Sequence, residues 1–276
     1  MQNDFVKEIY LHIGLHKTGT SSIQATLAEN AQVLESKSIF YLTEMGINHS
    51  EFLVPMFMEN PSEFYLEQNK NQSEKDVKKL YNEKQKKLKD ILFNVRLEKI
   101  VFSGEDISGM SEAELKNFHV YIKSIFPLAK IKIVICFRDP SDYVASALQQ
   151  SCKTGFCSVR PFEYKNIHYK NLIEKFALIF DINDFFLYDF EVAKKNHLGL
   201  VGYFLEHVLQ INNLKTSNIK ILRDNDSITD IAVHIIKSIN TNTSSSLFAK
   251  GEDGGMLKYE RYLNDTQALW SLKGDK

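Results

Sequence analysis

The chain has almost no net charge. Its 34 Lys and Arg residues are balanced by 35 Asp and Glu residues, which leaves a formal net charge of −1 at pH 7. Proteins that bind nucleic acid or anionic membrane surfaces usually carry a clear positive excess. We therefore expect no nucleic-acid partner, while a local basic cleft is still compatible with this composition.

Long apolar runs are also missing. No uninterrupted apolar run approaches the length that spans a bilayer, and the first residues show no basic segment followed by an apolar core. We expect a cytoplasmic protein with no membrane insertion. The sequence indicates no particular oligomeric state.

Cysteine is scarce, with Cys136, Cys152 and Cys157 alone in the chain. Their number is odd and their spacing shows no metal-like pairs, so neither a disulfide framework nor a metal site is predicted. Reduced thiols are the simplest interpretation. Cys136 lies within an apolar strand pattern and is expected in the core.

The rest of the composition is that of a globular protein, with 43% hydrophobic and 25% charged residues. Strand and helix patterns alternate, which is typical of a parallel sheet covered by helices on both faces. We predict a three-layer α/β/α fold with strands at about 8–14, 38–42, 99–103, 130–137 and 184–188. A single domain over residues 1–276 would carry a mostly helical insertion at about 46–96 and a flexible segment at about 241–255.

Several helices have clear sequence signals. An apolar face runs from Ile23 to Leu34, and Ser111 and Glu114 have the spacing of a capping box. The lysine-rich segment 70–89 has apolar residues at helical spacing among interspersed acids. This pattern favours a solvated amphipathic helix over a basic patch.

The most distinctive segment follows the first predicted strand. Gly14 and Gly19 bracket a loop whose backbone N–H groups can converge on an anion, with Lys17 as a cation inside it. The positive end of the following helix would present the hydroxyls of Thr20, Ser21 and Ser22. The glycine spacing is that of a Walker A loop, but there the lysine directly follows the second glycine. The displaced lysine indicates a different phosphorylated ligand.

A second basic position follows the fourth predicted strand. Arg138 ends this strand, and Ser146 lies eight residues later on the next helix. Open α/β proteins bind ligands at the carboxyl edge of the sheet, where both residues and the glycine loop would meet. A guanidinium binds phosphate with paired donors, so the chain offers two anion sites on adjacent turns.

These two motifs resemble those of the sulfotransferases that use 3′-phosphoadenosine 5′-phosphosulfate (PAPS). In that family a Lys-x-Gly-Thr loop binds the 5′-phosphosulfate, which corresponds here to Lys17, Thr18, Gly19 and Thr20, and an Arg and a Ser eight residues apart bind the 3′-phosphate. The stretch from Gly14 to Gln24 is most similar to bacterial members that act on carbohydrate or other small acceptors. The resemblance implies a fold similar to the P-loop NTPases.

The resemblance also implies roles for the loop residues. Lys17 and the loop amides would stabilise the leaving phosphate without a metal. Thr20 or Ser21 would bind the 5′-phosphate, with Ser22 as a further contact, and His16 could contact the sulfate or the acceptor. The segment Lys250-Gly251 partly resembles the family's Arg-Lys-Gly closure over the 3′-phosphate, but Ala249 replaces the first basic residue, and a plain flexible loop is an equal alternative.

The acceptor hydroxyl would need a general base. Glu105 is the leading candidate because a strand and a glycine turn deliver it to the same edge of the sheet, although it could merely cap the next helix. His49 is the second candidate and could instead be an ordinary loop histidine. Asp106 could substitute for Glu105, while His12, inside a strand, is most simply a packed histidine.

Two other classes of function are compatible with the same loop. A P-loop kinase or nucleotide triphosphatase is disfavoured by the position of the lysine and by the lack of an evident metal-holding acid. A nucleotide-binding protein without catalysis would keep the fold and present no base. For an enzyme, the resemblance implies a small molecule or a glycan as the acceptor. The aromatic part of the insertion suits sugar stacking, a lipid or core packing equally, so it does not identify the acceptor.

Overall fold

The computed structural model describes residues 3–15, 17–64, 72–140, 142, 169–214 and 218–222. The chain divides into two units, one formed by Met1–Arg138 with His168–Asp224 and the other by Asp139–Ile167 with Asn225–Lys276. Apart from residues 139, 140 and 142, everything described below belongs to the first unit. The expected flexible segment at about 241–255 lies outside the described residues, and the single domain stays a prediction.

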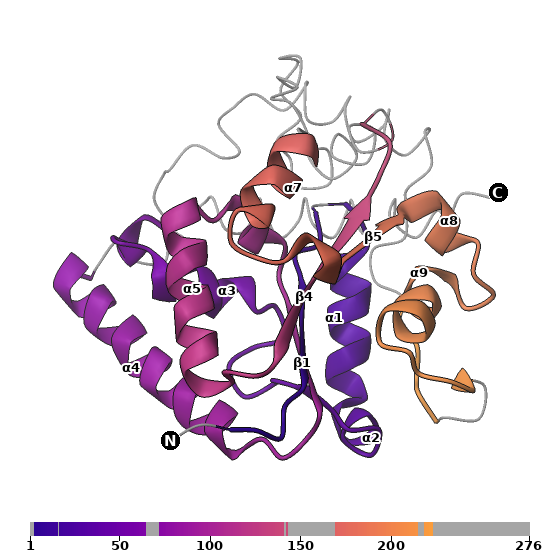
Figure 1. Ribbon diagram of the computed structural model, residues 1–276, viewed down its shortest axis with the longest axis horizontal. Helices are drawn as coiled ribbons and strands as arrows, with labels where there is room; N and C mark the ends of the chain where they lie inside the picture. The colour runs from indigo at the N-terminus through magenta and orange to yellow at the C-terminus, as the bar shows by residue number, and fades with distance from the viewer. Residues whose placement is uncertain are drawn as a thin grey trace, which may run out of the picture. The chain divides into compact units, whose positions relative to one another are not determined.

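Five parallel strands form one sheet in the order β2-β3-β1-β4-β5, of which Figure 1 labels β1, β4 and β5. The strands are β1 (Glu8–His12), β2 (Ile39–Tyr41), β3 (Lys99–Ser103), β4 (Lys130–Phe137) and β5 (Phe185–Asp189). Each strand lies within two residues of its predicted range. The alternating strand and helix pattern therefore predicted the α/β class and the parallel sheet correctly.

Helices connect the strands and lie on both faces of the sheet. They are α1 (Thr20–Glu29), α2 (Ala31–Glu35), α3 (Ser50–Phe57), η1 (Pro61–Glu63), α4 (Glu74–Asn94), η2 (Glu105–Gly109), α5 (Glu112–Ile125), α7 (Tyr169–Ala177), η3 (Ile182–Asp184), α8 (Phe190–Lys194), α9 (Gly199–Tyr203) and η4 (Phe204–Val208). In Figure 1, α3, α4 and α5 lie on one side of β1 and β4, and α1, α2 and α9 lie on the other.

The core consists of two apolar layers, one on each face of the sheet. In β1, Ile9 and Leu11 pack in the layer that includes side chains of α3, α4, α5 and α7, whereas Tyr10 packs in the layer that includes α1, α9 and η4. This alternation follows from the period of two in a strand. Cys136 of β4 is fully buried in the second layer, as predicted. The fold is therefore a three-layer α/β/α sandwich.

The predicted insertion at about 46–96 contains α3, η1 and α4. Two of its aromatic side chains, Phe52 and Phe57, are buried in the first apolar layer, so core packing accounts for both. The helix α4 buries Val77, Leu88 and Leu92 and exposes all of its lysines except the half-buried Lys84, which confirms an amphipathic helix. Among the described residues, no helix combines the length and the apolar composition needed to cross a bilayer.

Helix ends follow the local sequence signals in one case and depart from them in another. The capping box is present at α5, where Glu114 N–H donates to Ser111 Oγ and Ser111 N–H donates to the Glu114 carboxylate. The expected continuous helix from Ile23 to Leu34 is instead broken at Asn30. The Asn30 amide donates to the carbonyl of Lys220 and its oxygen accepts from Lys220 N–H, so a distant segment determines the break.

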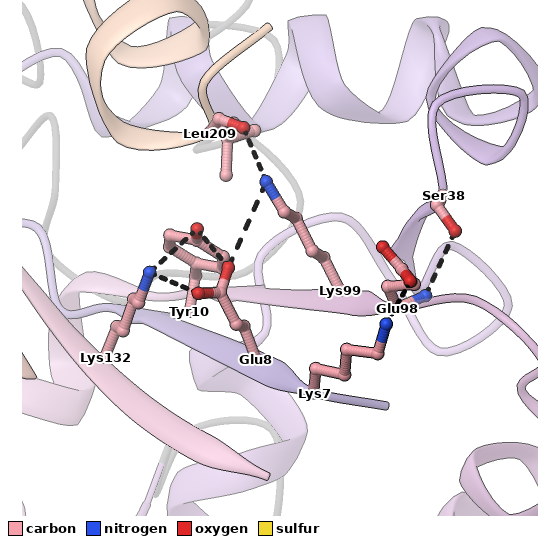
Figure 2. A network of polar contacts seen from close by, with 8 residues as sticks. All are labelled: Lys7, Glu8, Tyr10, Ser38, Glu98, Lys99, Lys132 and Leu209. Carbon is pink, nitrogen blue, oxygen red and sulfur yellow. Dashed lines mark hydrogen bonds and ion pairs between the residues drawn. The ribbon is translucent and has the colours of Figure 1, made fainter. Parts of the chain in front are cut away.

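A charged network lies near the amino ends of the central strands (Figure 2). The Glu8 carboxylate pairs with Lys132 at 2.6 Å and accepts from the Tyr10 hydroxyl at 2.7 Å. Lys99 lies 4.0 Å from the same carboxylate and donates to the Leu209 carbonyl at 3.1 Å. Burial raises the pKa of Glu8, but the bonds from Lys132 and Tyr10 outweigh it, so this pKa lies below its ordinary value. The two ion pairs of Glu8 therefore link β1 to its neighbours β3 and β4.

Candidate functional site

The carboxyl ends of the strands meet at one edge, because all five strands are parallel. The central strand β1 lies between β3 and β4, and the chain crosses from one side of β1 to the other between β3 and β4. Ligands of open α/β sheets bind at such a reversal point. The loops that start there carry the glycine loop after β1, Glu105 after β3, Arg138 after β4 and Phe190 after β5.

The backbone of the glycine loop has an unusual conformation. Lys17 has a φ of 64° and Gly19 a φ of 75°, both in the left-handed region. A left-handed backbone costs a lysine about 1–2 kcal/mol. A residue other than glycine therefore keeps this conformation only where the surrounding structure holds it in place, as often happens at functional sites. A Cβ at Gly19 would also stand 2.2 Å from Leu200 Cδ2, so only glycine fits at this position.

The amino end of α1 opens onto this loop. The cap residue Gly19 offers no side-chain bond, and the first turn contains no acidic residue. The first helical bond runs from Ile23 N–H to the Gly19 carbonyl at 3.2 Å. The N–H groups of Thr20, Ser21 and Ser22 therefore precede the helical bonding pattern, and with the helix dipole they create a positive end that favours an anion.

The hydroxyls of the loop have different surroundings. Thr18 is fully buried and its hydroxyl donates to the Leu15 carbonyl at 2.5 Å, which stabilises the turn. Thr20 is also buried, and its Oγ1 has no hydrogen-bond partner among the described residues. Ser21 and Ser22 are half-buried. His16, predicted to contact sulfate or acceptor, lies outside the described residues.

Arg138 connects the two predicted anion sites. Its Nη1 donates to the Lys17 carbonyl at 2.7 Å, although the two residues are 121 positions apart in the chain. The guanidinium carbon lies 4.5 Å from the centre of the Phe190 ring, which is cation–π distance. The Arg138 backbone bonds the Tyr169 hydroxyl through both its N–H and its carbonyl. The guanidinium is therefore fixed against the lysine loop.

Arg138 also retains bonding capacity. Its Nε is buried and has no hydrogen-bond partner in the part of the chain that the structure describes. An unpaired buried donor is unfavourable, and a bound anion would satisfy it. Ser146, Lys250 and Gly251, the other residues assigned to the 3′-phosphate, lie outside the described residues.

Glu105 begins the short helix η2 at the end of β3, and it is half-buried. The preceding Gly104 allows α3 to approach closely, because a Cβ there would stand 2.4 Å from Ser50 Oγ and 2.5 Å from Ser50 N. Asp106 N–H donates to Ser50 Oγ at 3.0 Å, which fixes this turn. The Glu105 carboxylate acts electrostatically on His12, at the end of the neighbouring strand β1.

His49 has both ring nitrogens bonded inside the protein. Ser103 N–H donates to its Nδ1 at 3.1 Å, so Nε2 carries the proton and donates to the Leu42 carbonyl at 2.8 Å. The side chain is fully buried, and this burial lowers its pKa to about 4. His49 therefore has neither an exposed nitrogen nor a free lone pair, and of the two candidate bases the geometry favours Glu105.

Sequence reasoning missed the residues that position Arg138. Tyr169 and Phe190 come from α7 and α8, and neither belongs to a recognised motif. The position of Phe190 at the carboxyl edge of the sheet could have been predicted from the sequence, because this residue directly follows β5, just as Arg138 directly follows β4. Tyr169 comes from a helix far along the chain and gave no signal. His12 was correctly predicted to be buried, but its partner Ser103 was not foreseen.

Within the described ranges, no group of three His, Cys, Asp or Glu side chains is arranged to hold a metal ion.

No protein-family model and no curated protein matches the chain. The solved structures that are similar to it include the following two. A sulfotransferase from Alicyclobacillus acidocaldarius is 12% identical with a TM-score of 0.44, over 94% of this chain and 96% of that one. A structure from the PezAT toxin-antitoxin system of Streptococcus pneumoniae is 11% identical with a TM-score of 0.37, over 87% of both chains. At these low scores the fold assignment rests on the observed strand order, which is that of a parallel α/β sheet.

Proposed function

We propose that this protein is a sulfotransferase that transfers a sulfuryl group from PAPS to a hydroxyl or amine of a small-molecule or glycan acceptor. The observation that carries the proposal is the bond between Arg138 Nη1 and the Lys17 carbonyl. It brings together two motifs that were identified separately in the sequence. A nucleotide with phosphates at both the 3′ and 5′ positions is the ligand that two adjacent anion sites suit best.

The described residues fit such a nucleotide. Thr20 Oγ1 and Arg138 Nε are buried polar atoms without hydrogen-bond partners among the described residues, and the positive end of α1 has no acidic cap. PAPS, when bound, supplies the sulfuryl group on a phosphosulfate anhydride. Lys17 and the α1 amides would stabilise negative charge on the 5′ side. Arg138 would bind the 3′-phosphate together with Ser146, and we assign Lys250 and Gly251 to the same end.

Glu105 is our choice for the general base. Its carboxylate is partly exposed at the carboxyl edge of the sheet, whereas His49 is enclosed and bonded at both nitrogens. A general base must reach the proton that it removes. Glu105 would accept the proton of the acceptor hydroxyl as this oxygen attacks sulfur, and no metal has a role in the proposal.

Calorimetry with adenosine 3′,5′-bisphosphate tests the donor site. Lys17→Ala and Arg138→Ala each remove a charged hydrogen-bond donor, worth about 1.5–3 kcal/mol, so the Kd should rise roughly 10- to 150-fold. Lys116→Ala is the matched control, because this lysine is exposed on α5. Unchanged affinity in both site variants, or tighter binding of ATP with Mg²⁺ than of the bisphosphate, would rule out the assignment and, in the second case, favour a P-loop kinase or NTPase.

Turnover with PAPS and a panel of hydroxyl and amine acceptors tests the reaction. Glu105→Gln should lower kcat by about 10²- to 10⁴-fold, the usual contribution of a general base, while bisphosphate affinity stays near that of the wild type. Bisphosphate binding without any product across the panel would support a nucleotide-binding protein without catalysis.

A further inference from the structure

The backbone of the glycine loop is bonded to a side chain from another part of the sheet. Arg138 directly follows β4, the strand that pairs with β1, and its Nη1 donates to the Lys17 carbonyl at 2.7 Å. The acceptor is a main-chain oxygen, so this bond acts on the conformation of the loop and does not involve the Lys17 ammonium group.

The backbone at Lys17 needs such support. The Thr18 N–H donates to the Leu15 carbonyl at 3.3 Å, which closes a four-residue turn with Lys17 as its third residue. Lys17 has a φ of 64°, and a turn with a positive φ at its third residue normally has glycine there. Left-handed residues turn successive backbone N–H groups to one side, which is how backbone concavities for anions form. The affinity of the loop for an anion therefore depends on the positive φ of Lys17.

The bond from Arg138 is strong enough to supply this support. A hydrogen bond from a charged donor stabilises more than a neutral one, and its net contribution is similar in size to the cost of a left-handed residue. Without this bond, the loop would lose a stabilising contribution as large as the cost of its conformation. A larger share of the molecules would then have a negative φ at Lys17 and a weaker anion site.

Arg138 is itself held in place. The centre of the Phe190 ring lies 4.5 Å from the guanidinium carbon, and a Cβ at Gly19 would stand 3.9 Å from Cε2 of the same ring. One aromatic ring is therefore next to both the guanidinium and the loop. The Tyr169 hydroxyl bonds the N–H and the carbonyl of Arg138. Because a guanidinium is a rigid fork, a group fixed in this way loses little freedom when it bonds the loop.

We propose that Arg138 is a positioning residue for the loop around Lys17, whose Nη1 bond holds the Lys17 backbone in the left-handed conformation that binds an anion. This role is additional to the 3′-phosphate contact proposed above, since a guanidinium has five N–H donors and the loop takes one of them. The 5′ half of the site then depends on Arg138 even for a ligand without a 3′-phosphate. The inference rests on the proposed anion site in the loop.

The conformation of Lys17 in the ligand-free protein is the first test. Cα and Cβ chemical shifts report the sign of φ, so the Lys17 shifts should be those of a left-handed residue in the wild type and should move toward those of a negative φ in Arg138→Ala. Arg138→Met, which keeps the apolar stem and removes the donors, gives the same comparison if alanine unfolds the protein. Left-handed shifts that persist in the folded variant would overturn the inference.

Arg96→Ala is the matched control for these spectra. Arg96 also donates to backbone carbonyls, those of Phe93 and Val95, and its guanidinium carbon lies 5.0 Å from the centre of the Phe5 ring. It precedes β3, near the amino end of that strand, whereas the loop follows the carboxyl end of β1. Its removal should leave the Lys17 shifts and the anion affinity unchanged.

Calorimetry with adenosine 5′-phosphosulfate and with pyrophosphate is the second test, because neither ligand has a 3′-phosphate. Arg138→Ala should weaken both roughly 5- to 30-fold, the cost of a left-handed lysine expressed as a change in Kd. In a Lys17→Gly background the loss should fall below about 3-fold, since glycine adopts a positive φ readily. A Lys17→Ala background lacks the same ammonium group but retains the cost of the conformation, so there the full loss should remain.

The outcomes separate this inference from the proposed function. If Arg138→Ala weakens binding of adenosine 3′,5′-bisphosphate and leaves both other ligands unaffected, the inference is wrong and the donor site stands. Equal losses in the Lys17→Gly and Lys17→Ala backgrounds would also overturn it, because Arg138 would then not act through the Lys17 backbone. Binding of pyrophosphate but not of the bisphosphate by the wild type would overturn the proposed donor, and the pyrophosphate cycle would still decide the role of Arg138. Binding of none of these anions would overturn both.

Discussion

Replacing Gly14 by alanine should destabilise the protein through one steric conflict. The new Cβ would stand 2.3 Å from Thr20 Oγ1 and 3.0 Å from His12 Nε2, and both side chains are buried. Thr20 is β-branched and lies in the first turn of α1, so its χ1 angle has few alternatives. The helix, the loop or the imidazole must therefore shift.

The expected magnitude is that of a buried overpacking change, about 1–3 kcal/mol, which corresponds to a fall in Tm of about 2 to 12 °C for a domain of this size. Gly109→Ala is the matched control. Gly109 is exposed, has no positive φ, and has no atom within 4 Å of its added Cβ. Its substitution should change stability by less than about 0.5 kcal/mol.

The assay is thermal and urea unfolding of both variants in the absence of ligand. A Thr20→Ala background gives a second check, because it removes the atom that the new Cβ meets. In that background Gly14→Ala should cost clearly less than in the wild type. Equal melting temperatures for Gly14→Ala and Gly109→Ala, or a cost of Gly14→Ala that does not depend on residue 20, would refute the reasoning.

Two further predictions concern stability. Ser111→Ala removes the capping box of α5 and should lower the free energy of unfolding by about 1 kcal/mol, measured by urea denaturation, and an unchanged midpoint would contradict it. Burial lowers the pKa of His12 and His49 to about 4, from an ordinary value of 6.5, so between these pH values the unfolded chain binds more protons than the folded one. Stability should therefore fall as the pH is lowered from 6.5 toward 4, by up to about 3 kcal/mol for each histidine. Urea midpoints at pH 7, 6 and 5 measure this slope, which should be smaller in His49→Gln, and an identical slope in this variant would argue against the effect.

Local sequence patterns determined most of the secondary structure. Strands such as Lys99–Ser103 and Lys130–Phe137 were predicted at their observed bounds, because a buried strand in a parallel sheet needs a continuous run of β-branched and apolar residues. The capping box at Ser111 was equally readable, since its bonds lie within four residues. The glycine loop after β1 was recognisable because its glycines and the helix that follows are adjacent in sequence.

Long-range contacts decided what the sequence left open. Asn30 breaks the expected first helix because it bonds Lys220, and no local signal marks a partner 190 residues away. His49 is fully buried because α3 packs closely against the end of β3, and this burial is the reason that we propose Glu105 as the base.

The sequence alone determined that the chain has a parallel α/β sheet and a glycine-bracketed loop around Lys17, because both depend on residues that are neighbours in the chain. The tertiary structure decided that Arg138 contacts that loop, that Phe190 and Tyr169 fix its position, and that His12 and Thr20 face the same glycine. The physical reason is that strand order brings together side chains that are distant in sequence, and hydrogen-bond geometry then depends on which of them are enclosed.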